Sequence, residues 1–499
     1  MGRNDDCYAR LLDRRREIRE LDSCSHLLDW DLETYMPATG AEHRARQQAL
    51  LAGLMHQRRT APELAELLEN VAPEEGSAEA ACVREIKREY DRQINLPVEL
   101  VEELARMRTL ARNAWKEARE KKSFAIFQPW LEKIVTLKRR EAEAVGYSEQ
   151  PYDALLDEFE PGETTSAVES VFVPLRTALA DLLKRILGSK RRPDKTILEQ
   201  VYPVSAQKEL GRKAATAIGF NFKEGRLDTT THPFCAAIGP GDCRITARFS
   251  ERFFPGGLFG ILHEAGHGIY EQNLDVSHWG TPLGEACSMG VHESQSRLWE
   301  NFVGRSRSFW KHAFPVAQSM FPDALGLTKL DEFYAAINNV EPTFIRVEAD
   351  EVTYNLHIFL RFELEQALVS GSLDVADVPG AWREAFTRDF QRTPPDDAMG
   401  CLQDIHWSLG MLGYFPTYAL GNVYAAQFME AARNDLGDLD LMFARGEFLT
   451  MREWLTDKIH RHGARYYPRD LVQRVTGAPP SPEPLVRHLE SKYSEIYAL

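Results

Sequence analysis

The sequence lacks an excess of positive charge and any long apolar run. Its 75 acidic residues outnumber 60 basic residues, which gives a formal net charge of -15 at pH 7. A nucleic-acid binder needs clustered lysine and arginine to neutralise phosphates, and an anionic membrane surface attracts the same cations. No segment approaches the roughly 20 uncharged apolar residues that span a bilayer. We therefore expect neither nucleic acid nor a membrane as a partner.

Cysteine is scarce and shows no pairing pattern. The seven cysteines are odd in number and widely scattered, and no Cys-X-X-Cys spacing occurs among them. Such a pattern indicates neither a zinc knuckle nor a disulfide framework. The N-terminal segment has no apolar run typical of a secretory signal, and Asp6 occupies the position at which N-myristoylation needs Ser or Thr. These features predict a reduced, cytoplasmic protein.

Helical periodicity dominates the chain. The composition, 43% hydrophobic and 27% charged, is that of a globular protein with a large core. Apolar residues recur at intervals of three and four, as they do on one face of a helix. The longest such stretch follows Pro97, and the segments with this pattern are 98–146, 41–71, 165–187, 425–436 and 484–498. Since no repeat, linker or break in composition marks a boundary, we predict one catalytic domain over residues 1–499.

Strand signals are few. Residues 242–249 alternate arginine with apolar residues directly after the turn-forming Gly239-Pro240-Gly241, which predicts a strand. Residues 344–347 form a second, weaker candidate. The expected fold is therefore mainly α, with a small β element near the middle of the chain.

One short segment carries a metal-binding pattern. His263-Glu264-Ala265-Gly266-His267 is an HExxH motif within a helical apolar stripe. Two imidazoles four residues apart on a helix point the same way and can share one ion, whereas Glu264 between them reaches a metal-bound water. Small residues at Gly266 and Gly268 let another segment approach closely. The alternative is a chance match, in which both histidines lie in the core or on the surface.

Catalytic zinc needs a third protein ligand, which a following helix can supply. Glu293 lies 26 residues after His267 in a helical segment, and this separation suits two helices that fold back on each other. Glu271 is a rival on the same face as the histidines, but it would lie about 12 Å along the helix axis from His263, at about 1.5 Å per residue. Glu285 and Glu300 stay open as weaker alternatives.

Several further motifs resemble those of the thermostable metallocarboxypeptidases of the Taq carboxypeptidase type. Their order and the chain length also match, so that the resemblance covers essentially the whole chain. Besides HEAGH, the matching segments are His232-Pro233-Phe234, Asp242-Cys243-Arg244-Ile245-Thr246, His292-Glu293-Ser294-Gln295, Ile345-Arg346-Val347-Glu348-Ala349-Asp350, Gly400 to Trp407 (GCLQDIHW), Leu28-Asp29-Trp30-Asp31 and Tyr35-Met36-Pro37. The joint occurrence of so many motifs is far more specific than HExxH alone.

The resemblance implies a helical two-lobed body with a deep active-site groove, usually a homodimer. It implies a zinc enzyme, in which cobalt often substitutes, that removes C-terminal amino acids from peptides with broad specificity. It assigns His263, His267 and Glu293 as metal ligands and Glu264 as the catalytic base. It also assigns the arginine of the IRxxAD motif, here Arg346, to the terminal carboxylate of the substrate.

A carboxypeptidase needs a fixed cation for the terminal carboxylate, and the planar fork of arginine binds both oxygens. Arg346 lies in an apolar stretch, where an unpaired arginine is costly to bury. Its structural alternative is an ion pair with Glu348 or Asp350. Arg244, on a presumed edge strand, is a second candidate, because an edge strand can pair with the backbone of a substrate. Arg244 can equally buttress the site through Asp242.

The developing oxyanion needs a hydrogen-bond donor. Tyr414 and Tyr418 follow the GCLQDIHW segment on a loop, and analogy with related zinc peptidases favours Tyr418. Aromatic packing is the alternative for either ring. His406 can orient the substrate or support the site together with Asp404.

Two other functions stay open. A zinc oligopeptidase or dipeptidyl carboxypeptidase would share the metal and the base but cut elsewhere in the peptide. A helical scaffold protein with a vestigial site would bind no metal at all.

Overall fold

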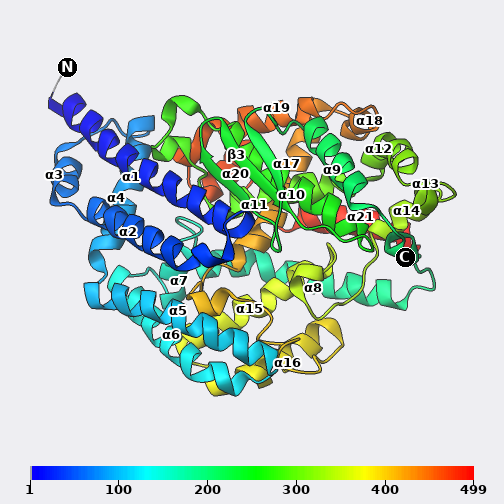
Figure 1. The fold of residues 1–499 in the computed structure, drawn as a ribbon, viewed down its shortest axis with the longest axis horizontal. Coiled ribbons are helices and arrows are strands. Elements are labelled where there is room, and N and C mark those ends of the chain that lie inside the picture. The colour runs from blue at the N-terminus through cyan, green and yellow to red at the C-terminus, as the bar shows by residue number, and fades with distance from the viewer. Residues whose placement is uncertain (1–2) are drawn as a thin grey trace. The chain divides into compact units, whose positions relative to one another are not determined.

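The computed structural model describes residues 3–499 and is mainly helical (Figure 1). The chain divides into two compact units, each built from three separate segments. The first unit comprises the chain up to residue 93, residues 194–337 and residues 428–477; the second comprises 94–193, 338–427 and 478–499. The predicted fold class, mainly α with a small β element, is confirmed. Along residues 3–499, no helix combines the length and the low charge that crossing a bilayer requires.

The first unit holds the β-strands and most of the helices. Its helices are α1 (Arg3–Thr34), α2 (Ala41–Arg59), α3 (Pro62–Asn70), α4 (Ala78–Asn95), α9 (Val204–Ile218), α10 (Phe254–Gln272), α11 (Met289–Arg297), α12 (Arg307–Met320), α13 (Pro322–Leu325), α14 (Leu330–Ile337), α18 (Leu439–Ala444), α19 (Leu449–Lys458) and α20 (Pro468–Thr476).

The second unit is helical in its regular elements. These are α5 (Val98–Glu120), α6 (Phe124–Val145), α7 (Pro151–Leu156), α8 (Thr165–Gly188), α15 (Thr353–Ser370), α16 (Val378–Phe390), α17 (Pro416–Leu436), which continues past the unit boundary at residue 427, and α21 (Glu483–Tyr497).

Two of the predicted helical stretches are each interrupted once. The stretch 98–146 forms α5 and α6, because Lys122 between them adopts a positive φ of 54° that no helix continues through. The stretch 41–71 forms α2 and α3, and Pro62 begins the second of these, where its missing N–H leaves no bond unmade. The predicted helices 165–187 and 425–436 lie within α8 and α17, and 484–498 agrees with α21 up to Tyr497, one residue short of the predicted end.

The small sheet contains β1 (Gly225–Thr229), β2 (Cys235–Gly239) and β3 (Asp242–Ala247) in the order β1-β3-β2. β3 pairs in parallel with β1 and antiparallel with β2. The strand prediction for 242–249 is confirmed over most of its length. The prediction that this strand lies at the edge is wrong, because β3 has a hydrogen-bonded neighbour on both sides. β3 packs against α10 (Figure 1).

The weaker strand prediction, for 344–347, is wrong. Arg346 begins a short 3₁₀ turn that ends at Glu348. The backbone N–H of Arg346 donates to the side chain of Gln403 at 2.8 Å, so the group that a strand would use for pairing is occupied by a side chain.

Helix α10 carries the HExxH motif and is buried along most of its length. The predicted apolar stripe is confirmed, because Leu258, Ile261, Leu262 and Ile269 are all at most 3% exposed. Burying each such side chain stabilises the fold by roughly 1.5–3 kcal/mol. Pro255 in the first turn fits a helix start, since its fixed φ is already helical. The motif therefore lies on a helix whose orientation is fixed by packing.

Candidate metal centre

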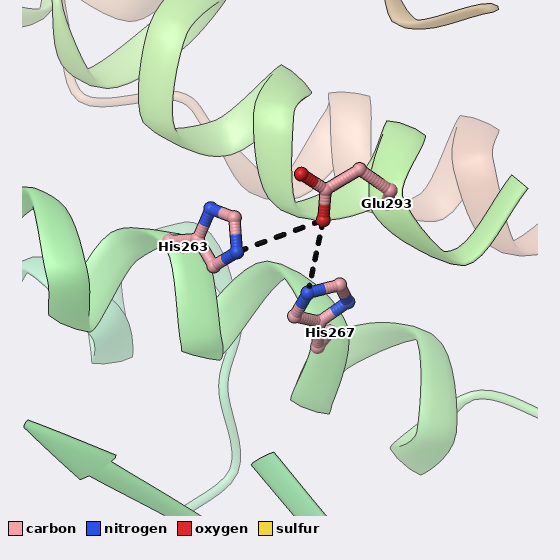
Figure 2. Close-up of side chains that lie close together, drawn as sticks. All are labelled: His263, His267 and Glu293. Carbon is pink, nitrogen blue, oxygen red and sulfur yellow. Dashed lines mark ion pairs between the residues drawn. The ribbon is translucent and has the colours of Figure 1, made fainter. Parts of the chain in front are cut away.

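The three predicted ligands lie together in the first unit. His263 and His267 are one turn apart on α10, and Glu293 extends toward both from α11 (Figure 2). Its Oε2 lies 3.7 Å from His263 Nε2 and 3.5 Å from His267 Nε2. Potential ligand atoms of the three side chains all lie within 4.8 Å of one another, and no other group of three His, Cys, Asp or Glu side chains between residues 3 and 499 is placed in this way.

Gly266 explains how α11 comes close enough. A Cβ at this position would lie 2.6 Å from the backbone oxygen of Gln295 and 2.7 Å from the Cα of Ser296. Such distances are well inside van der Waals contact, so a larger residue would push the two helices apart. Gly268 has a similar role toward Phe220 and Cys243. The expectation that these glycines allow close approach is confirmed, and Gly266 is the position that matters for Glu293.

Glu293 is held from behind by groups of its own helix. Its Oε1 accepts a hydrogen bond from Arg297 Nε at 2.7 Å, and its Oε2 accepts one from Ser296 Oγ at 3.0 Å. Although burial raises it, Arg297 and His263 hold the pKa of Glu293 well below its ordinary value. The carboxylate is therefore ionised and oriented toward the two histidines before any ligand binds.

Glu300, which the sequence left open as an alternative metal ligand, contacts a ligand histidine instead of joining the cluster of three ligands. Its Oε2 lies 2.9 Å from His263 Nδ1, on the far side of the ring from Glu293. Arg297 Nη1 donates to the same oxygen at 3.1 Å. A carboxylate on the second nitrogen of a ligand histidine fixes the ring and its tautomer. The sequence holds a signal for this network, because Glu293, Arg297 and Glu300 are spaced by four and three residues, as side chains on one helix face are. A search for metal ligands alone overlooks this spacing.

His267 has different surroundings. Its Nδ1 is buried and makes no hydrogen bond, and its ring stacks on His292 with centroids 4.4 Å apart. Burial, reinforced by His292, lowers the pKa of His267 to about 3. His292 itself pairs with Glu271 at 2.8 Å, so this rival carboxylate is engaged elsewhere. A neutral imidazole is the form that binds a metal, and the donor set of two imidazoles and one ionised carboxylate fits zinc.

Glu264 has the properties of a general base. It is 6% exposed, and burial together with Glu293 and Glu300 raises its pKa to about 7. A carboxyl group that titrates near neutral pH can both accept a proton and return it. The last rival, Glu285, bonds to Arg15 at 2.9 Å and is not part of the cluster.

Arg244 lies on β3 and is tied to its own strand. Its Nε and Nη2 donate to Asp242 at 2.8 and 2.6 Å, and its guanidinium lies 4.1 Å from the centre of the Trp30 ring. Because β3 is the central strand, its backbone offers no free edge to a peptide, and the argument from strand addition fails. The contacts favour the alternative, in which Arg244 acts through Asp242.

Arg346 belongs to the second unit, where it is 6% exposed. Its Nε and Nη2 both donate to Asp404 Oδ1, at 3.0 and 2.9 Å, and its Nη1 donates to Tyr354 Oη at 3.1 Å. The predicted alternative partners, Glu348 and Asp350, are wrong, since Asp404 of the GCLQDIHW segment takes this place. Arg361 donates to the other oxygen of Asp404 at 2.7 Å. Two buried guanidinium groups thus share one carboxylate.

The aromatic candidates lie beside this arginine pair. The Tyr418 ring centre is 4.9 Å from Arg346 Cζ, and the Tyr418 hydroxyl is 3.3 Å from His406 Nε2. Burial lowers the pKa of His406 to about 4, which leaves it neutral at pH 7. Tyr414 stacks edge-on with Tyr418, at 5.2 Å between ring centres. The predicted pairing of His406 with Asp404 is loose, at 4.0 Å.

The chain is similar to known metallopeptidases along nearly its whole length. The sequence profile of the family described as Carboxypeptidase Taq (M32) metallopeptidase matches residues 10–493. The chain is 48% identical to Thermostable carboxypeptidase 1 of Thermus thermophilus, covering 98% of this chain and 99% of that protein. It is 39% identical to Carboxypeptidase 1 of Bacillus subtilis, covering 98% of each. The crystal structure of an M32 carboxypeptidase from Deinococcus radiodurans superposes with a TM-score of 0.96 at 37% identity, covering 99% of this chain and all of that one.

Proposed function

We propose that His263, His267 and Glu293 hold a catalytic zinc ion in this chain. The chain belongs to the Carboxypeptidase Taq (M32) metallopeptidase family. Membership of this family makes the protein a peptide hydrolase of the metallocarboxypeptidase class. The observation that carries the zinc assignment is the convergence of the three ligand side chains within 4.8 Å. Cobalt, which accepts the same donors, is proposed as a functional substitute.

When bound, zinc supplies a Lewis acid that polarises the scissile carbonyl and makes water more acidic. The protein supplies the proton transfers. Glu264 takes the proton of the attacking water and passes it to the leaving amine, a task for which its raised pKa is suited. Glu300 holds the ring of His263, and Arg297 holds the carboxylate of Glu293. Both ligands therefore keep their orientation through the reaction.

Substrate recognition is proposed to rest on the arginine cluster. Arg346 binds the C-terminal carboxylate of the peptide, because it and Arg361 share a single counter-ion and leave a surplus of positive charge. Tyr418 is proposed as the donor to the developing oxyanion. His406 and Arg244 are retained as proposed substrate contacts, although the ion pair of Arg244 with Asp242 favours a buttressing role for this arginine.

Other predictions stay proposals. They are a single catalytic domain over residues 1–499 with a deep active-site groove, a homodimer, and a reduced, cytoplasmic location. The homodimer and the groove rest on the family resemblance, and the location rests on the scattered cysteines. Peptides with a free C-terminus, of broad sequence, are the proposed substrates.

The test is product analysis on N-terminally blocked peptides incubated with the zinc-loaded enzyme. We expect single C-terminal amino acids to be released in succession, and we expect amidation of the C-terminus to abolish cleavage, because the arginine site then has no carboxylate to bind. Release of dipeptides or of internal fragments would identify a dipeptidyl carboxypeptidase or an oligopeptidase instead. A protein that binds no zinc or cobalt and cleaves nothing would support a scaffold role.

A further inference from the structure

Two cysteines on adjacent strands lie beside the metal-binding helix, diagonal to each other in the strand register, since Cys235 is paired with Ile245 and Cys243 with Ala237. Cys235 begins β2 and Cys243 lies in β3, and their sulfur atoms are 3.6 Å apart. Cys243 is buried and its sulfur lies 3.8 Å from the backbone oxygen of Gly268, one residue after the ligand His267. Cys235 is half-buried. Neither thiol has a part in the hydrolytic chemistry assigned above.

We propose that Cys235 and Cys243 form a reversible disulfide when the protein meets a peroxide, and that this bond lowers the peptidase activity. The formation of the disulfide does not depend on the proposed function. Only its effect on peptide hydrolysis rests on that function. The pair is a modification site, in which the two thiols are oxidised together by two electrons and hydrogen peroxide is reduced to two molecules of water.

The chemistry proceeds in two steps. The sulfur of Cys235, the more accessible of the two, attacks peroxide: an S–O bond forms, the O–O bond breaks, and the released hydroxide takes up the thiol proton to become water. The sulfur of Cys243 then attacks the Cys235 sulfur of the resulting sulfenic acid. An S–S bond forms, the S–O bond breaks, and the hydroxide leaves as water with the proton of Cys243.

The surroundings make this oxidation slow. The contact with Cys243, followed by burial, raises the pKa of Cys235 well above its ordinary value, and the carboxylates of Glu264 and Glu271 raise it further. The reactive species is the thiolate, so a raised pKa slows the first step. We therefore expect the pair to stay reduced in the absence of an oxidant and to respond to sustained exposure.

The bond would distort the segment beside α10. The sulfur separation must shrink from 3.6 Å to about 2 Å, the length of a disulfide bond. Cys243 has little room to move, because it is only 4% exposed and its sulfur already lies 3.8 Å from the backbone oxygen of Gly268. The displacement therefore falls on Cys235 and on Phe234 before it.

Phe234 is itself tied down. Its N–H donates to the Thr246 hydroxyl oxygen at 2.8 Å, and its carbonyl accepts from the Thr246 hydroxyl and backbone N–H, both at 3.0 Å. Pulling Cys235 toward β3 strains these bonds and presses the sheet against α10, which carries both histidine ligands and Glu264. This gives the His-Pro-Phe motif, which the hydrolytic mechanism leaves unused, a place in the control of the site.

The experiment compares the zinc-loaded wild-type enzyme with Cys235→Ser, Cys243→Ser and Cys24→Ser. The last removes an exposed cysteine outside the pair and is the matched control. Each protein is treated with hydrogen peroxide, quenched with catalase, and divided for peptide mapping, zinc content and hydrolysis of a blocked peptide, before and after dithiothreitol.

We expect a Cys235–Cys243 linkage in the wild type and in Cys24→Ser, with kcat/KM lowered by up to about 100-fold, the scale of a 1 Å displacement near a catalytic site. Dithiothreitol should restore the activity, and the zinc content should not change. Cys235→Ser and Cys243→Ser should keep their activity through the treatment. The Cys235→Ala and Cys243→Ala variants replace the serine variants if these fold poorly.

Three results would overturn the proposal: no linkage in the wild type, a linkage that leaves kcat/KM unchanged, or an equal loss of activity in both serine variants. The mapping readout does not depend on hydrolysis. A reduced wild-type enzyme that cleaves no peptide would therefore refute the proposed function, while the linkage itself would still be tested.

Discussion

The two compact units each contain a cluster of buried charges, and the clusters have opposite surpluses. Around the histidines of the first unit, the carboxyl groups of Glu264, Glu293 and Glu300 meet two guanidinium groups, those of Arg297 and Arg305, so that the surplus rests on Glu264, whose pKa is raised to about 7. In the second unit, Arg346 and Arg361 share the single carboxylate of Asp404. A buried charge without a partner costs several kcal/mol. Each surplus therefore indicates the sign of the missing ligand: a cation in the first unit and an anion in the second.

The largest expected effect comes from the base of the acidic cluster. Glu264→Gln keeps the shape of the side chain but cannot accept a proton. We expect kcat to fall by about 10²- to 10⁴-fold, the usual contribution of a general base. Zinc content, measured by atomic absorption, should match the wild type, because Glu264 is not a ligand. Unchanged turnover in a variant with full zinc content would show that Glu264 is not the general base. The negative charge of the first cluster would then serve only to bind the metal.

The positive surplus is tested by Arg346→Ala. We expect kcat/KM on a peptide with a free C-terminus to fall by about 10²- to 10³-fold, because loss of one partner from a buried charge pair typically costs about 2–5 kcal/mol. Asp404 keeps its bond to Arg361, so the fold should be retained.

The control for this prediction is Arg392→Ala. Arg392 is exposed, and it contacts the same segment through Pro342 and the Phe344 ring. It should leave the kinetics unchanged. A further comparison uses the amidated peptide, on which the wild type and Arg346→Ala should be equally poor. A similar loss on free and amidated peptides would mean that Arg346 supports the fold and does not bind the carboxylate.

The approach of α11 to α10 gives a test on the metal itself. Gly266→Ala places a methyl group where the backbone oxygen of Gln295 would be 2.6 Å away, so Glu293 must move from the histidines. We expect zinc affinity to fall by at least about 10- to 100-fold, the effect of losing an outer partner of a ligand. Gly260→Ala, in the same helix but with open space at the Cβ position, is the matched control. It should bind zinc normally, because the added methyl group meets no neighbouring atom. Alanine there should also favour the helix by about 1 kcal/mol relative to glycine. Equal zinc affinity in both variants would contradict the role of Gly266.

The sequence predicts the acidic cluster better than the basic one, for a physical reason. His263, Glu264 and His267 lie within one turn and a half of a helix, and helical geometry alone places them together. Glu293 follows on α11, the next α-helix along the chain, so that the single connection of residues 273–288 suffices to bring it close. Arg346 instead meets Asp404 across 58 residues, and no local periodicity encodes that contact. For this reason, the two partners predicted as alternatives for Arg346 are its sequence neighbours Glu348 and Asp350.

The errors in the fold have the same origin. Residues 242–249 show the alternation of a strand, but alternation carries no information about neighbours, and the central position of β3 follows from pairing with β1 and β2. At 344–347 the apolar residues suggest a strand, whereas the side chain of Gln403 takes the N–H of Arg346. Contacts with distant segments decide both cases: backbone pairing in the first and a side chain in the second.

The smallest expected effect separates the two histidine ligands. His263 Nδ1 meets the carboxylate of Glu300, whereas His267 Nδ1 has no hydrogen-bond partner and stacks on His292. Glu300→Gln keeps the length of the side chain but removes the charge that fixes the His263 tautomer. We expect zinc affinity to fall by about 10-fold, the lower end of the range for such partners. Glu271→Gln, which loosens His292 and thereby only the stacking on His267, should change zinc affinity less. A larger loss in Glu271→Gln than in Glu300→Gln, measured by competition with a chromogenic chelator, would show that stacking orients a ligand more firmly than a charged hydrogen bond does.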